Sequence, residues 1–104
     1  MELRLVDPSQ GFDPPTRPQA DFAIIATPTA THATIAGPLL AAGIPCLVEK
    51  PLALTLADAG ALAAFEQLSV GHVERFNPAL DVVRHVRPRF VEATRLTPWP
   101  SPTT

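Results

Sequence analysis

The sequence predicts an α/β fold in which helices flank a parallel β-sheet. Short apolar runs, typical of buried strands, alternate along the chain with alanine-rich segments whose apolar residues have helical spacing. Strands that alternate with helices in this way form parallel sheets through right-handed crossovers. The chain has 104 residues, of which 46% are hydrophobic and 17% charged, so it holds one modest core and is not disordered by composition.

Two candidate strands stand near the start of the chain. Residues 3–6 form a short apolar run that ends at Asp7, the residue before a proline. Residues 8–20 follow, with turn-forming residues and little hydrophobic periodicity. Residues 22–26 are a continuous apolar run, as expected for a strand that is covered on both faces in a parallel sheet.

A helix is predicted over residues 30–42, where apolar residues recur at helical spacing among many alanines. Thr29 or Thr31 can cap its first turn, and Gly43 is a natural end. Pro38 lies inside this segment, removes one backbone hydrogen bond and should kink or divide the helix.

The alternation continues through the rest of the chain. A threonine with an acidic residue three positions later resembles a capping box and opens the second helix, and an asparagine followed by proline opens the third. The remaining predicted elements are a buried strand over residues 44–48, a helix over 55–67, a strand over 68–74, a helix over 78–87 capped by Asn77, and a strand with one wet face over 89–96.

The composition argues against several classes of protein. The net charge of −2 gives no electrostatic case for binding nucleic acid or an anionic membrane. Cys46 is the single cysteine, which excludes an internal disulfide framework and fits a reducing, cytoplasmic location. Residues 22–48 carry no formal charge, but prolines interrupt them too often for a membrane-spanning helix. The histidines, Cys46 and Glu49 lack the spacing of a metal site.

Three polar clusters, at residues 27–32, 49–51 and 72–78, follow predicted strands. If these strands are parallel, the clusters lie along one rim of the sheet, where open α/β sheets bind their ligands. Lys50, the only lysine of the chain, stands beside a carboxylate in the second cluster and is a candidate proton handler or substrate orienter. The alternative is a solvated lysine in a turn. The Lys50–Pro51 bond can be cis at modest cost.

Four other residues receive structural interpretations. His72 falls inside the predicted strand over 68–74, which favours a hydrogen-bonded structural histidine over an acid or a base. Phe65, Phe76 and Phe90 are predicted to belong to the core.

Taken in order, the motifs resemble the Gfo/Idh/MocA family of NAD(P)-dependent oxidoreductases. They are Ala26-Thr27-Pro28 with His32, Glu49-Lys50-Pro51 after a buried strand, and the segment from Val70 to Ala79, Val-Gly-His-Val-Glu-Arg-Phe-Asn-Pro-Ala. The last segment is similar to members that act on nucleotide-activated sugars, such as UDP-N-acetylglucosamine 3-dehydrogenases. The resemblance covers about residues 21–97.

The resemblance implies a partial Rossmann-type parallel sheet with flanking helices, plus the first strand of an α/β substrate domain. A dinucleotide-binding part would span residues 1–77, and the start of a substrate domain with a proline-rich tail would span 78–104. The implied reaction oxidises a secondary alcohol of a sugar or nucleotide-sugar by hydride transfer to NAD or NADP. Family members are often homo-oligomers, which makes a homo-oligomer an expectation here too.

The resemblance also implies roles for individual residues. Lys50 would be catalytic, near the reacting hydroxyl. The cofactor-binding set would be Thr27, Pro28 and His32 by the ribose and pyrophosphate, Glu49 and Lys50 by the nicotinamide, and Arg75 and Asn77 by cofactor or substrate. Asp7 could hold the adenosine ribose, or it could simply end a strand at a turn.

The sequence departs from the family pattern in two respects. It contains no Gly-x-Gly-x-x-Gly turn, the motif that lets a backbone approach the pyrophosphate. It also stops soon after the segment that resembles the first substrate-domain strand, so we expect a truncated member with weak catalysis and marginal stability. The rival interpretation is a non-catalytic remnant or an interaction module that uses an exposed sheet edge.

Overall fold

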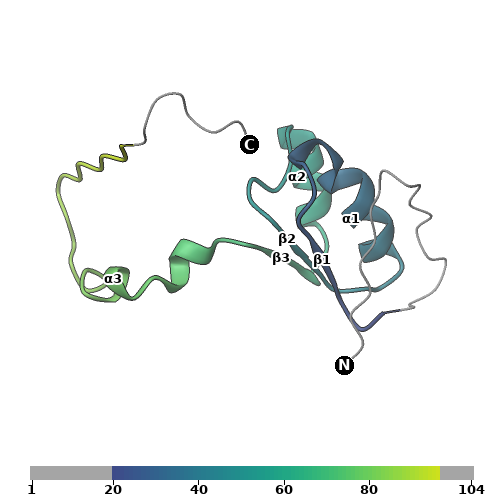
Figure 1. Ribbon diagram of the computed structural model, residues 1–104, viewed down its shortest axis with the longest axis horizontal. Coiled ribbons are helices and arrows are strands. Elements are labelled where there is room, and N and C mark those ends of the chain that lie inside the picture. The colour runs from purple at the N-terminus through teal and green to yellow at the C-terminus, as the bar shows by residue number, and fades with distance from the viewer. Residues whose placement is uncertain (1–19, 97–104) are drawn as a thin grey trace. The chain divides into compact units, whose positions relative to one another are not determined.

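Within residues 20–96, which the computed structural model describes, three short parallel strands form one sheet (Figure 1). They are β1 (Ala23–Ile25), β2 (Cys46–Val48) and β3 (Leu68–Val70), in the spatial order β1-β2-β3. The register pairs Ile25 with Val48 and Val48 with Val70, so the three carboxyl ends lie level. The predicted α/β class with a parallel sheet is therefore confirmed.

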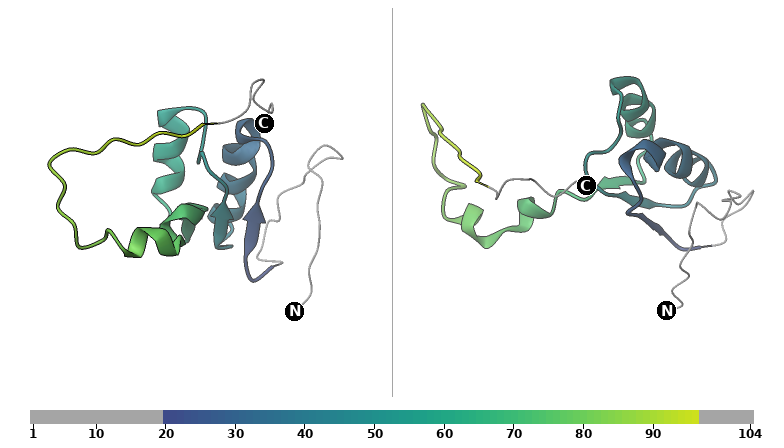
Figure 2. Two further views of the ribbon diagram at one scale, coloured as in Figure 1. Left: turned by 60° about the vertical axis from the view of Figure 1, so that its left-hand side comes forward. Right: turned by 45° about the horizontal axis from the view of Figure 1, so that its top comes forward.

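Two helices connect these strands and pack on the same face of the sheet, as both views in Figure 2 show. They are α1 (His32–Ala41), preceded by a 3-10 turn over Thr29–Thr31, and α2 (Leu56–Ala63). Between helices and sheet lies one core, formed by the buried residues Ile25, Ile35, Ala36, Leu39, Leu40, Ile44, Cys46, Val48 and Leu62. Burial of this apolar surface is the main favourable term for folding this part of the chain.

The opposite face of the sheet is open, which corrects the expectation that residues 22–26 are covered on both faces. Along β1 and β2 the residues alternate between buried and exposed, as in a strand with one wet face. Ile24 is 60% exposed and Leu47 39% exposed, whereas Ile25 and Val48 are buried. A continuous apolar run makes a strand suitable for cover on both faces of the sheet. It does not show that the described residues supply cover for both.

Helix α1 ends where the sequence predicted. Gly43 has a positive φ of 81° and its N–H donates to the Leu40 carbonyl at 2.9 Å, while the Ile44 N–H donates to the Leu39 carbonyl at 3.0 Å. This pair of bonds is a Schellman motif, which needs a residue that tolerates the left-handed conformation. Pro38 does not divide the helix, since α1 is continuous from His32 to Ala41.

The capping box that opens α2 is confirmed. The Oγ1 atom of Thr55 accepts a hydrogen bond from the Asp58 N–H at 3.0 Å and donates one to Asp58 Oδ2 at 2.7 Å. The helix is shorter than predicted and ends at Ala63, and Phe65, two residues later, packs against the core. Strand β3 follows almost at once.

The chain divides into two units, Met1–Val73 and Glu74–Thr104. A 3-10 turn over Val73–Phe76 leads into the second unit. There the Asn77 side chain caps α3 (Pro78–Asp81) and accepts a hydrogen bond from the Ala79 N–H at 3.0 Å. The helix is much shorter than the predicted 78–87. Residues 82–96 contain neither helix nor strand, so the strand expected over 89–96 does not form in this structure.

Two core assignments in this unit are also wrong, since Phe76 is 81% and Phe90 80% exposed. Strand β3 ends at Val70, so His72 lies outside the strand in which it was expected and is exposed. The predicted strand over 3–6 and Asp7 fall outside the described residues. Among residues 20–96, no helix has the length and apolar character needed to cross a membrane.

Candidate functional site

Three loops leave the carboxyl ends of the strands and share one rim of the sheet. They begin with Ala26 and Thr27 after β1, Glu49 after β2 and Gly71 after β3. Parallel pairing puts all three at the same end, and the Glu49 N–H donates to the Ile25 carbonyl at 2.9 Å, which extends the pairing to the start of the second loop. The prediction that positions 27 and 50 lie at the same end of the sheet is confirmed.

The loop after β1 folds back onto the start of α1. The Thr31 N–H donates to the Pro28 carbonyl at 2.9 Å, and Thr31 Oγ1 lies 2.7 Å from the same carbonyl and 2.8 Å from Thr27 Oγ1. Because the Thr31 hydroxyl is hydrogen-bonded within this loop, the Thr31 side chain does not cap α1. The contacts hold Thr27 half-buried and leave Pro28 exposed at the rim.

His32 does not reach the surface of the rim. Its side chain is 1% exposed, and both ring nitrogens face backbone carbonyls. Nε2 lies 2.8 Å from the Thr27 oxygen, while Nδ1 lies 3.1 Å from the Pro51 oxygen and 3.3 Å from the Leu52 oxygen. Both ring nitrogens are thus engaged by backbone oxygens of the two loops, and the buried ring is not presented at the surface of the rim, near which the resemblance implied a contact to the cofactor.

Glu49 and Gly71 face each other across the ends of β2 and β3. A Cβ added to Gly71 would stand 2.9 Å from Glu49 Oε1, closer than real Cβ contacts come. The carboxylate also accepts a hydrogen bond from the Lys50 N–H, at 3.2 Å from Oε2. Gly71 is itself buried, and its N–H donates to the Val48 carbonyl at 2.8 Å. Because residue 71 has no side chain, the Glu49 carboxylate can lie at this position on the rim.

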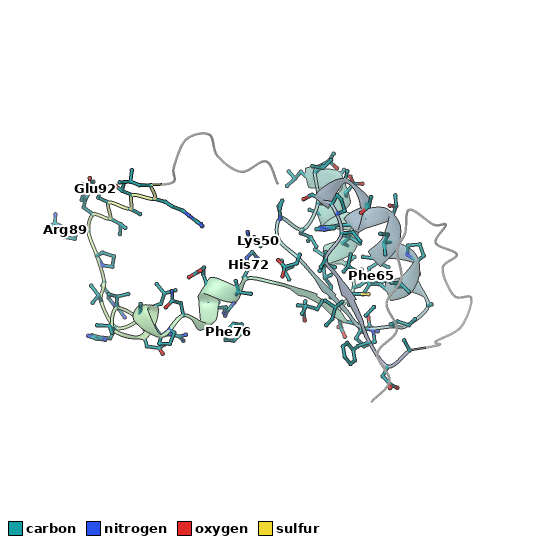
Figure 3. The ribbon with its side chains drawn as sticks, in the orientation of Figure 1. Lys50, Phe65, His72, Phe76, Arg89 and Glu92 are labelled. Atoms are coloured by element: carbon teal, nitrogen blue, oxygen red, sulfur yellow. The ribbon has the colours of Figure 1, made fainter. Side chains whose placement is uncertain are left out.

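Lys50 is exposed and forms no ion pair with any described residue. Its peptide bond to Pro51 is cis, as the sequence allowed. Lys50 follows Val48 by two positions, and His72 follows Val70 by two; the register pairs Val48 with Val70. Figure 3 shows Lys50 and His72 at the same end of the sheet. His72 thus joins the candidate site, and the signal that could have found it is this equal offset from paired strand ends.

Arg75 and Asn77 belong to the second unit. Arg75 is exposed, and its carbonyl accepts a hydrogen bond from Arg84 Nη2 at 3.2 Å. The Asn77 side chain is engaged locally, since Oδ1 caps α3 and Nδ2 donates to Glu74 Oε2 at 2.8 Å.

Neither a metal cluster nor a surface hollow adds to the candidate site within the described residues. No group of three or more His, Cys, Asp or Glu within residues 20–96 could hold a metal ion. A shallow hollow of about 150 Å³ is lined by residues at or next to the strands, among them Phe22, Pro45 and Gln67, which directly precede β1, β2 and β3. It therefore lies toward the amino ends of the strands, opposite the rim.

A parallel sheet with helical crossovers and three polar loops at its carboxyl rim defines part of a nucleotide-binding α/β domain. Comparison with known proteins assigns this domain. Residues 12–70 match the family described as an oxidoreductase family with an NAD-binding Rossmann fold. The chain belongs to this family, Gfo/Idh/MocA, and the cofactor that the family implies is NAD or NADP.

Two curated relatives show the range of similarity. The chain is 38% identical over 89 residues to a UDP-N-acetylglucosamine 3-dehydrogenase of Acidithiobacillus ferrooxidans, a match that covers 78% of this chain and 28% of that protein. It is 34% identical over 92 residues to a protein of Amycolatopsis mediterranei assigned as a UDP-kanosamine synthase oxidoreductase subunit, a match that covers 75% and 26%. The chain thus spans about a quarter of the length of these relatives.

A solved structure supports the fold assignment. The chain is similar, with a TM-score of 0.52 and 40% identity, to the crystal structure of a Klebsiella pneumoniae protein assigned as an oxidoreductase. The match covers 58% of this chain and 19% of that one.

The residues at the rim fit one end of a dinucleotide. The Thr27 hydroxyl, the Glu49 carboxylate over Gly71 and the exposed Lys50 ammonium are donors and acceptors suited to ribose hydroxyls and to a carboxamide. The sequence contains no glycine-rich turn of the kind that binds the pyrophosphate of a dinucleotide.

Proposed function

We propose that this chain carries the nicotinamide side of the site of an NAD(P)-dependent oxidoreductase that oxidises a secondary alcohol of a sugar or nucleotide-sugar. The observation that supports it most is the position of Lys50. The sole lysine of the chain is exposed at the carboxyl end of β2, on the rim that it shares with Thr27 and Gly71. The names of the two relatives support the choice of a nucleotide-sugar.

The proposal gives each rim residue a part. Lys50 Nζ lies by the reacting hydroxyl, where the neutral amine takes the hydroxyl proton or the ammonium orients the oxygen. Glu49 lies by the nicotinamide, and Thr27 with Pro28 borders the ribose. The family resemblance supports further roles for Arg75 and Asn77 of the second unit, toward cofactor or substrate, and for Asp7, which lies outside the described residues, toward the adenosine ribose.

A bound nicotinamide would supply the hydride acceptor for oxidation of the secondary alcohol to a ketone. The chain's own contribution is to orient the alcohol and to receive its proton. A lysine suits both tasks, because its stem is flexible and its head carries up to three donors.

Titration calorimetry of the full chain with NADH and NADPH tests the proposal. We expect saturable binding with a Kd on the order of micromolar to a few hundred micromolar, a range that needs only part of a full dinucleotide site. Lys50→Met should abolish dehydrogenation of UDP-N-acetylglucosamine while leaving the fold intact. The matched control is Arg87→Met, an exposed basic residue of the second unit. Absence of heat at millimolar cofactor would refute cofactor binding by this chain.

An alternative function is a non-catalytic interaction module. The open face of the sheet favours it, because Phe22 is 51% and Ile24 60% exposed there. Apolar surface on a sheet face commonly marks a site of contact with another polypeptide. The same titration separates the two functions, since an interaction module leaves NADH and NADPH unbound.

A further inference from the structure

We propose that His32 is a positioning residue that ties the loop after β1 to the loop that carries Lys50. The structural part of this proposal stands on contacts within the first unit. Its consequence for catalysis rests on the proposed function.

His32 is the buried polar residue of the described core, at 1% exposure, and one of its largest fully buried side chains. A polar group taken out of water at this depth needs hydrogen-bonding partners, or its burial costs free energy. All the partners of His32 are backbone carbonyls of the two rim loops. The ring therefore sits where it links the loops, and the helix that carries it supplies a rigid base.

The contacts reach across the sequence. Nε2 lies 2.8 Å from the Thr27 carbonyl oxygen, five residues before His32. Nδ1 lies 3.1 Å from the Pro51 oxygen and 3.3 Å from the Leu52 oxygen, nineteen and twenty residues after it. Pro51 is the direct neighbour of Lys50. A shift of the ring would thus move the backbone that sets the position of the lysine.

The loop after β2 has little else to hold it by hydrogen bonds. Pro51 has no N–H, and in the described part of the chain no backbone–backbone hydrogen bond outside helices and strands involves residues 51–54. Leu52 packs against the core, which anchors one side chain. For residues 51–54, the described hydrogen bonds to the rest of the unit are those that the His32 ring makes with the Pro51 and Leu52 oxygens.

The number of N–H groups on the His32 ring determines how many of its contacts can be hydrogen bonds, so the exchange of ring protons with solvent is an informative measurement. A neutral imidazole carries one N–H and donates to one loop, whereas the doubly protonated ring donates to both. In each form at least one ring proton is buried in a hydrogen bond. In the wild-type chain, we expect a His32 ring N–H to exchange with solvent at least about tenfold more slowly than those of the exposed His72 and His85. Equal exchange at the three histidines would overturn the proposal.

Variants then test the positioning role itself. His32→Phe keeps a ring of similar size and removes both nitrogens, while His32→Gln keeps one donor. We expect the NMR order parameters of residues 52–54 to fall from a rigid value of about 0.85 toward 0.6 in His32→Phe, and to fall less in His32→Gln. Those of Cys46, Leu47 and Val48 in β2 should stay unchanged. His85→Phe, at an exposed position of the second unit, is the matched control.

A uniform fall across β2, α1 and the loop would show a general packing role and overturn the proposal, as would no change at residues 52–54. If His32→Phe does not fold, His32→Gln and ring exchange in the wild-type chain decide. The functional consequence is a loss of NADH affinity of about tenfold in His32→Phe, smaller in His32→Gln. If the wild-type chain binds no NADH, the proposed function fails, while the order parameters still test the positioning role.

Discussion

The carboxylate of Glu49 occupies space that a side chain at Gly71 would need. A Cβ at position 71 would stand 2.9 Å from Oε1 and 3.2 Å from Cδ of Glu49. The two residues leave the paired ends of β2 and β3, so the absence of one side chain determines where the other one rests. A substitution at Gly71 can therefore be used to perturb Glu49 in the candidate site. The sequence motif did not reveal this contact.

We predict that Gly71→Ala displaces the Glu49 carboxylate while the fold survives. The atom that the new methyl group meets first is the far end of a flexible side chain, which can swing away at little cost. On the proposed function, affinity for NADH should weaken by about tenfold, the worth of one charge-assisted hydrogen bond. Calorimetric titration measures the affinity, and thermal unfolding by circular dichroism shows whether the fold is kept.

Gly60→Ala is the control for this variant. Gly60 lies inside α2, and a Cβ there meets nothing within 4 Å. Alanine is the better helix former by about 1 kcal/mol, so this variant should gain stability with unchanged NADH affinity. Equal affinity in the two variants would contradict a role of the Glu49 carboxylate in cofactor binding.

We predict that Thr55→Ala costs about 1 kcal/mol of unfolding free energy, the usual worth of an N-cap. The Thr55 hydroxyl accepts from the Asp58 N–H, and without it that N–H loses its partner in the protein. Urea unfolding followed by circular dichroism measures the loss. Thr34→Ala, at an exposed position in the first turn of α1, makes the same chemical change. The Thr34 hydroxyl donates to the Thr31 carbonyl at 3.0 Å in an exposed hydrogen bond and caps no N–H, so this variant should lose clearly less than Thr55→Ala. A similar loss in both variants would argue against the cap.

Local signals in the sequence predicted well wherever a few neighbouring residues decide the structure. The cap at Thr55, the glycine end of α1 at Gly43 and the asparagine cap at Asn77 all depend on contacts within five residues. The order of strands and helices from β1 to β3 and their shared rim were also predicted, because alternating strands and helices produce parallel pairing.

Features that depend on distant partners were predicted less well. A strand over 89–96 needs a neighbouring strand to receive its hydrogen bonds, and propensity alone does not supply one. The strand around Ile24 was predicted to be covered on both faces, but in the described residues helices cover only one face of the sheet. The position of His32 between two loops arises from a contact nineteen residues away, which no local motif reveals.

We predict that Ile44→Ala destabilises the first unit by about 2–5 kcal/mol, because it removes a core side chain and leaves a cavity. Ile44 is 1% exposed and follows the glycine that ends α1. Ile24→Ala makes the same change at a position that is 60% exposed and should cost about 1 kcal/mol or less. Urea unfolding of the two variants compares them directly. Equal losses would contradict the placement of the core on one face of the sheet.

We predict that Cys46 makes the protein less stable at alkaline pH. Burial raises the pKa of the Cys46 thiol, because the thiolate is poorly solvated where the side chain lies. As the pH rises above about 8.5, the unfolded chain releases the thiol proton while the folded chain retains it. The contribution of the thiol to stability is therefore complete below that pH and is lost as the pH rises through the pKa of the folded state.

The measurement is the free energy of unfolding in urea at a series of pH values from about 7 to about 10. Wild type should lose up to about 1.4 kcal/mol more per pH unit than Cys46→Ala over the alkaline part of the series. The comparison uses the slopes, because removal of the buried sulfur also lowers the starting stability of the variant. All other titratable groups are shared by the two proteins, so their effects cancel. Parallel curves would mean that the thiol ionises equally in the folded and unfolded chains, and that Cys46 is not buried as the structure has it.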